Sequence, residues 1–241
     1  MSGVVNGVVL QLTLRATLGR KRTVIFVIMP VILIVITALL KATAQSPVWP
    51  PEFLGVFGFV VVALTALIIG TSVLGAEIDD GSIIHLLATP VSRLSVILTK
   101  FIAAVILTVA FGAIPLYLAG AIATGPASKL AVGLLAGALA ASVAYNALFV
   151  MLSAVTSKAI ALGLLYLLVW EGLLATIVGG VRLLSVNQYA LGIANSIADN
   201  SGLHAHLTLT TAVVLGVIVT CAALAFAARR LSSFSLTGDA V

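Results

Sequence analysis

The sequence predicts an all-α membrane protein with six transmembrane helices, because it is strongly apolar and contains several long stretches without a charged residue. Of its 241 residues, 62% are hydrophobic and 8% are charged, whereas a soluble domain is about 25% charged. A helix needs roughly 20 apolar residues to cross a bilayer. Five stretches without Asp, Glu, Lys or Arg suit such a crossing: residues 23–40, 53–76, 101–128, 130–157 and 200–228.

The sixth expected span, residues 159–181, is interrupted by one charged residue, Glu171. The connections between the spans are too short for a sizeable soluble domain, so we expect one transmembrane domain over residues 1–241. Two further helices are expected beside the spans. Apolar residues at helical spacing within residues 1–22 predict an N-terminal interfacial helix. Val186, Tyr189 and Ile193 predict a short helix on the outer surface, between the last two spans.

The basic residues predict the orientation of the chain. With the N-terminus inside, nine of them are cytoplasmic: Arg15, Arg20, Lys21, Arg22, Arg93, Lys100, Lys158, Arg229 and Arg230. Three are external: Lys41, Lys129 and Arg182. This asymmetry follows the positive-inside rule, and an even number of spans then places both termini in the cytoplasm. The net charge of +5 does not indicate nucleic-acid binding, because that needs basic residues gathered on one face.

No catalytic motif is present. Gly70 and Gly75 have the glycine spacing of a phosphate-binding loop, but Ala76 and Glu77 follow where a lysine and a hydroxyl residue are needed. His204 and His206 are two residues apart and point to different sides of a helix, so we expect no metal site. The chain is therefore predicted to be no enzyme and to hold no cofactor.

The longest polar stretch between spans runs from residue 77 to residue 100. Glu77, Asp79 and Asp80 come just before an apolar run, a place where a helix N-terminus favours negative charge. Pro90 suits a first helical position after a break. The pattern is compatible with a helical hairpin at the inner membrane surface and equally with an ordinary solvated loop.

This stretch resembles the coupling element of type-2 ABC transporter permeases, the membrane subunits of ABC exporters. The matching residues are Glu77, Asp79, Gly81, Ser82, Leu86, Leu87, Pro90, Val91, Ser92, Arg93 and Lys100. Two positions depart from the family pattern: Ile78 stands where a basic residue is common, and Ile84 where an acidic one is usual. The interfacial helix, the six spans and the long outer segment before the last span are also similar to that family.

The resemblance implies a cytoplasmic coupling helix between spans two and three that docks a separate ATPase. The residues it assigns to this coupling are Glu77, Asp79, Asp80, Gly81, Ser82, Pro90, Arg93 and Lys100. It further implies two ATPase subunits that carry ATP and magnesium, and a second permease, either an identical copy or a paralogue. Surrounding lipids are expected, and the implied location is the cytoplasmic membrane of a prokaryote.

Polar residues inside the spans are the candidates for a translocation pathway. Ser142, Tyr145, Asn146 and Ser153 share one face of the fourth span, and such a stripe faces protein or a water-filled cavity rather than lipid. These residues either line the pathway or form hydrogen bonds that hold neighbouring helices together. Glu171 is the one acidic residue inside a span and needs a partner from another element. The alternatives to an exporter permease are a proton-coupled transporter that uses Glu171 and a non-transporting assembly or sensor subunit.

Overall fold

The computed structural model describes residues 20–43, 49–79, 93–198, 202–203 and 205–232, together with residues 11 and 13. Every regular element within these residues is helical, as the sequence predicts. The elements in chain order are α2 (Arg20–Thr43), α3 (Trp49–Phe53), η1 (Leu54–Gly58), α4 (Phe59–Asp79), α6 (Arg93–Thr108), η2 (Val109–Ala113), α7 (Ile114–Thr124), α8 (Lys129–Val155), α9 (Ala159–Leu165), η3 (Tyr166–Leu174), α10 (Ala175–Ile177), η4 (Gly179–Leu184), α11 (Val186–Ile197) and α12 (Leu209–Ser232).

Five continuous helical stretches are long and apolar enough to cross a membrane. They are Phe26–Thr43, Trp49–Gly75, Leu94–Thr124, Lys129–Val155 and Leu209–Leu231. Short π-helical segments, η1 and η2, continue the second and third of these without ending them. The prediction of an all-α protein that crosses the membrane several times is therefore confirmed. The predicted N-terminal interfacial helix and the predicted coupling helix fall largely outside the described residues.

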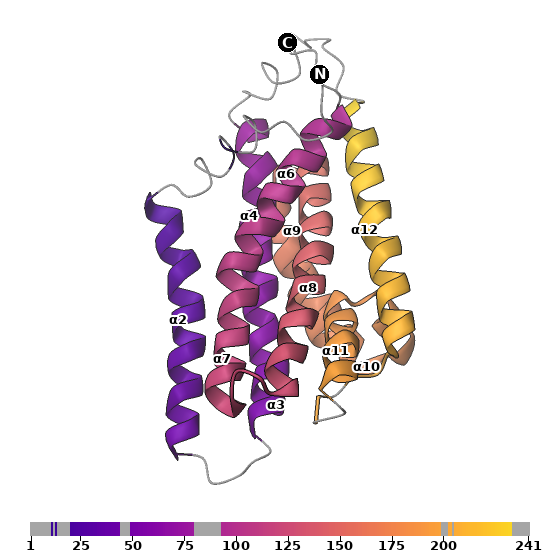
Figure 1. Cartoon of the computed structure of the whole chain (residues 1–241). Helices are drawn as coiled ribbons and strands as arrows, with labels where there is room; N and C mark the ends of the chain where they lie inside the picture. Colours follow the sequence, from indigo (N-terminus) through magenta and orange to yellow (C-terminus); the bar gives the residue numbers. More distant parts are fainter. Residues whose placement is uncertain are drawn as a thin grey trace.

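The predicted span over residues 159–181, the fifth of the six in chain order, forms a shorter apolar helix. Residues Ala159–Leu174 are helical, and α10 and the 3-10 helix η4 follow them. Figure 1 shows α8 ending at the upper end of the bundle and α12 beginning toward the lower end. The chain between them therefore returns through the bundle, although no single helix of full membrane length carries it.

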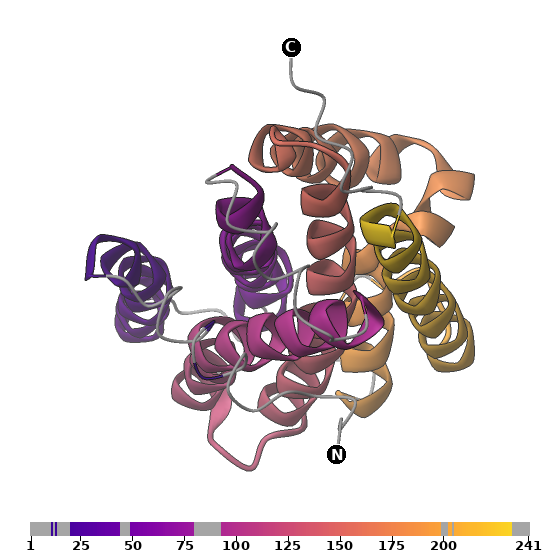
Figure 2. The ribbon, with the colours of Figure 1, turned by 90° about the horizontal axis from the view of Figure 1, so that it is seen from above.

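Helix α8 is the centre of the bundle. It packs against α4, α7, α11 and α12, and its buried face includes small residues that allow close approach. Helices α2 and α12 lie at opposite edges in the view of Figure 2. In α2, Phe26, Leu33 and Thr37 are buried, whereas most of its other apolar side chains are exposed. The window Leu209–Leu231 of α12 is likewise only 17% buried, so α2 and α12 form much of the outer surface of this chain.

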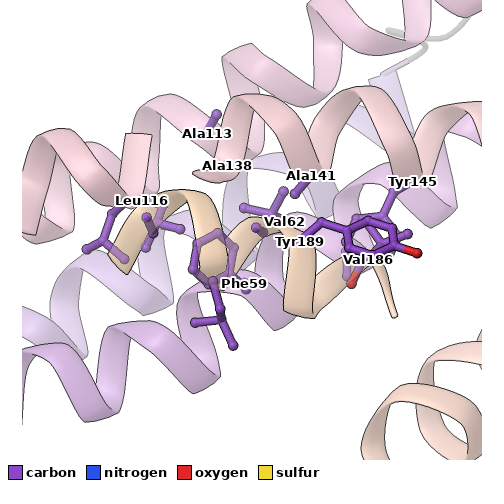
Figure 3. Close-up of a cluster of buried hydrophobic side chains, with 14 of the residues drawn as sticks. Phe59, Val62, Ala113, Leu116, Ala138, Ala141, Tyr145, Val186 and Tyr189 are labelled. Atoms are coloured by element: carbon purple, nitrogen blue, oxygen red, sulfur yellow. The ribbon is translucent and has the colours of Figure 1, made fainter. Parts of the chain in front are cut away.

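Helix α11 lies where the spacing of apolar residues predicts a helix, and it is packed into the bundle. Val186 and Tyr189 are buried against α8 and share a core with Phe59, Ala141 and Tyr145, as Figure 3 shows. The approach is close because α8 presents glycines there. A Cβ atom on Gly133 would lie 2.5 Å from the carbonyl oxygen of Ala194, and one on Gly137 would lie 2.5 Å from that of Ala190.

The position of this helix at the outer membrane surface stays a prediction, and the structure adds that its apolar face packs against protein. The buried side of the helix also carries Ala190 and Ala194. These small residues fit against the Gly133 and Gly137 positions of α8, in the manner of small-residue contacts between transmembrane helices. Helix α11 therefore belongs to the packed core.

Candidate functional site

The carboxylate of Glu171 accepts hydrogen bonds from groups on three helical elements, η3, α8 and α11. Glu171 lies in η3, a π-helical segment, and π-helical turns are frequent at functional sites. Its Oε1 atom accepts hydrogen bonds from the hydroxyl of Tyr166 at 3.1 Å and from that of Ser185 at 3.4 Å. Its Oε2 atom accepts one from the hydroxyl of Tyr145 on α8.

The same carboxylate lies at the N-terminus of α11. The backbone N–H of Asn187 donates to Oε1 at 3.2 Å, and Ser185 is the N-cap residue whose hydroxyl accepts from the N–H of Gln188. Free N–H groups and the helix dipole favour a negative charge at this position. Glu171 therefore joins η3, α8 and α11 at one point.

Further bonds hold the segment between η3 and α11. The hydroxyl of Tyr189 donates to the carbonyl of Leu183 at 2.5 Å. The Nε atom of Arg182 donates to the carbonyl of Ala175 at 2.9 Å, so Arg182 binds the backbone that follows η3. The sequence requires a partner for Glu171 from another element, and Tyr145 and the start of α11 are such partners. The polar stripe on α8 indicated Tyr145, whereas Tyr166 and Ser185 were not among the predicted site residues.

The other residues of the predicted pathway bond elsewhere. The hydroxyl of Ser142 donates to the carbonyl of Ala138 in its own helix, at 2.7 Å. The Nδ2 atom of Asn146 donates to the hydroxyl of Thr108 on α6, at 2.8 Å. The hydroxyl of Ser153 lies within hydrogen-bond distance of two carbonyls, that of Phe149 in its own helix at 2.9 Å and that of Thr71 on α4 at 3.2 Å. Tyr145 and Glu171 are thus brought together, while Asn146 and Ser153 connect α8 to two other helices.

The predicted ATPase-coupling residues are only partly described. Glu77 and Asp79 belong to the last turns of α4, and Arg93 begins α6. Asp80, Gly81, Ser82 and Pro90 lie outside the described residues. Lys100 is in α6, two turns beyond Arg93, and its side chain is fully buried. Its Nζ atom donates to the carbonyl of Val73 on α4, at 2.7 Å, so Lys100 contributes to the contact between helices and not to an exposed surface.

An apolar groove of about 310 Å³ lies on one side of the bundle, between α8, α11 and α12. Its walls include Tyr189, Gly216 and the free cysteine Cys221. Because neither an acid nor a base lines it, the groove offers no site for a charged ligand.

A bundle of apolar helices with polar contacts between them is the structure of a polytopic membrane protein. A comparison with family models identifies the protein family. The model of the ABC-2 family transporter proteins matches residues 31–234. The chain therefore belongs to the ABC-2 transporter family and is a membrane component of a transporter. A comparison with curated proteins finds no match.

Proposed function

We propose that this chain is the permease subunit of an ATP-driven exporter. Its family membership over residues 31–234 carries the proposal. The sequence contains no complete phosphate-binding loop, so ATP and magnesium bind to a separate ATPase. That ATPase docks on the cytoplasmic side, where the segment between α4 and α6 resembles a coupling element. Two ATPase subunits and a second permease complete the transporter.

We further propose six crossings, with both termini in the cytoplasm of a prokaryotic cell. Support comes from the ends of the helices in Figure 1, where the start of α2, the end of α8 and the end of α12 share the upper end of the bundle. The basic residues Arg20, Lys158 and Arg230 lie at those ends. The positive-inside rule assigns such an end to the cytoplasm. In this arrangement α9 and η3 are the fifth crossing.

The pathway is assigned to the face of α8 that carries Ser142, Tyr145, Asn146 and Ser153, together with Glu171. The junction at Glu171 supports this assignment, because it connects the fifth crossing to α8 and to α11. An arrangement in which these elements move relative to one another must break or remake bonds at that carboxylate. In this proposal Glu171 controls the relative movement of the helices around the pathway and need not bind the substrate itself.

Co-purification tests this proposal. The tagged chain is expressed together with the ABC ATPase that the proposal expects in the neighbouring gene, extracted in a mild detergent and analysed by native mass spectrometry. We expect a complex of two permease and two ATPase chains. A chain that purifies without any ATPase, while remaining folded, would contradict the proposal and favour a sensor or an ATP-independent transporter.

A further inference from the structure

The buried side chain of Lys100 crosses between two helices in the apolar interior. Its Nζ atom donates to the carbonyl of Val73 at 2.7 Å, across 27 residues of sequence. Val73 belongs to a buried apolar cluster with Ile97, Ala104 and Val150. A lysine amine in such surroundings is costly unless its donors are satisfied, so this bond fixes α6 against α4.

The position of this bond matters because α4 and α6 are the two helices on either side of the predicted coupling segment. Val73 is six residues before the end of α4 at Asp79, and Lys100 is seven residues after the start of α6 at Arg93. At 1.5 Å per residue, the bond lies about 10 Å inside each helix end. The bond therefore joins α4 and α6 close to the two helix ends that would receive a force from this segment.

A second bond continues the connection to the central helix. The hydroxyl of Ser153 on α8 shares its proton between two carbonyls: that of Phe149 in its own helix, at 2.9 Å, and that of Thr71 on α4, at 3.2 Å and two residues before Val73. The helices are also close there, since a Cβ atom on Gly70 would lie 2.9 Å from the Cβ of Phe149. Helices α6, α4 and α8 are thus joined in series by two side-chain bonds to neighbouring carbonyls of α4.

We infer that Lys100 is a positioning residue that makes α4 and α6 move as one unit and passes their displacement to α8 through the bond of Ser153. This inference rests on the proposed function and changes one assignment within it. The family pattern places Lys100 in the ATPase-coupling element, but its burial removes it from the docking surface. It acts on coupling from inside the membrane domain.

The test compares three substitutions of Lys100 in the full chain, reconstituted in lipid nanodiscs with the partner ATPase. Lys100→Met keeps an unbranched side chain but has no donor. Lys100→Gln has a neutral donor, and Lys100→Arg keeps the charge. The measurement is the stimulation of ATP hydrolysis by the permease, with thermal stability measured in parallel. Lys41→Met is the matched control, because Lys41 also donates to a carbonyl of another helix, that of Ile122 on α7, at the opposite end of α2 from Arg20.

We expect Lys100→Met to assemble with the ATPase and to lower the stimulation at least about threefold, the population change that one interhelical hydrogen bond produces. Lys100→Gln restores part of it, and Lys41→Met leaves it unchanged. A purely structural role would instead lower thermal stability in both lysine-to-methionine variants and leave the stimulation per assembled complex unaltered. That result overturns the inference.

Three further outcomes are decisive. If Lys100→Met fails to assemble, Ser153→Ala removes the contact with Thr71 together with the bond to Phe149 inside α8, and unchanged stimulation in that variant refutes the transmission to α8. If the wild-type chain binds the ATPase but never alters its hydrolysis rate, the proposed function fails and the inference with it. If the wild type stimulates and Lys100→Met stimulates equally, only the inference fails.

Discussion

Replacing Gly137 by alanine tests the packing of α11 against α8. The added Cβ atom would lie 2.5 Å from the carbonyl oxygen of Ala190 and 2.9 Å from the ring of Phe59. The ring can turn away, but the carbonyl belongs to the helix backbone. Because a carbon–oxygen contact needs about 3.3 Å, α11 must move away from α8 by about 0.8 Å.

The cost of this movement follows from the cost of overpacking, which is about 1–3 kcal/mol. Alanine also gains about 1 kcal/mol over glycine in a helix, and this gain masks part of the cost. Gly216→Ala in α12 is the matched control, because its Cβ atom would meet only an ordinary contact, 3.7 Å from Tyr189. The difference between the two variants is therefore the packing cost alone.

The assay is reversible unfolding of the purified chain in a mild detergent. We expect Gly137→Ala to be less stable than Gly216→Ala by about 1–3 kcal/mol. Gly133→Ala should behave like Gly137→Ala, since its Cβ atom meets the carbonyl oxygen of Ala194 at the same 2.5 Å. Equal stability of the Gly137 and Gly216 variants would refute the close packing of α11.

Three further predictions concern topology, the buried acid and coupling. In a Cys221→Ser background, a cysteine at Ser128 should react with an impermeant maleimide from outside the cell and one at Thr237 should not; the reverse labelling would contradict the orientation. Glu171→Leu should lower the free energy of unfolding by about 1–3 kcal/mol, because the donors around it lose their acceptor. Glu171→Gln keeps an acceptor and should lower it by less than about 1 kcal/mol. Equal losses in the two variants would show that the hydrogen bonds do not stabilise the junction. Gly81→Trp should leave the chain inserted but lower the ATPase stimulation; normal stimulation and transport in that variant would refute the coupling assignment.

The sequence predicts the membrane class and most of the helices because the bilayer imposes a simple rule on composition and length. Charge-free runs overlap all five long helices, although the runs beginning at residues 101 and 200 start seven residues after and nine residues before their helices, which begin at Leu94 and Leu209. The stretch from residue 159 to residue 181 was harder, since its polar Glu171 and its glycines change the helix type along the chain. Hydropathy alone does not distinguish a straight span from a broken one.

The site was predicted only in part, because contacts across the bundle depend on how helices pack. The polar stripe identified Tyr145, but its bond to Glu171 requires η3 to cross α8 at that level. The depth of α11 depends on the matching of Gly133 and Gly137 with Ala190 and Ala194, which is a property of two helices together. Sequence spacing on one helix could show that a close approach was allowed but not which helix made it.

The central claim is that this chain passes the energy of a separate ATPase to a membrane pathway. Its most direct test is the rate of ATP hydrolysis by the partner ATPase, measured in nanodiscs with and without the chain. The account predicts a complex whose rate differs several-fold from that of the ATPase alone and returns toward it when Gly81 is replaced by tryptophan. An unchanged rate in a stable complex, or substrate movement by the chain without any ATPase, would contradict the account.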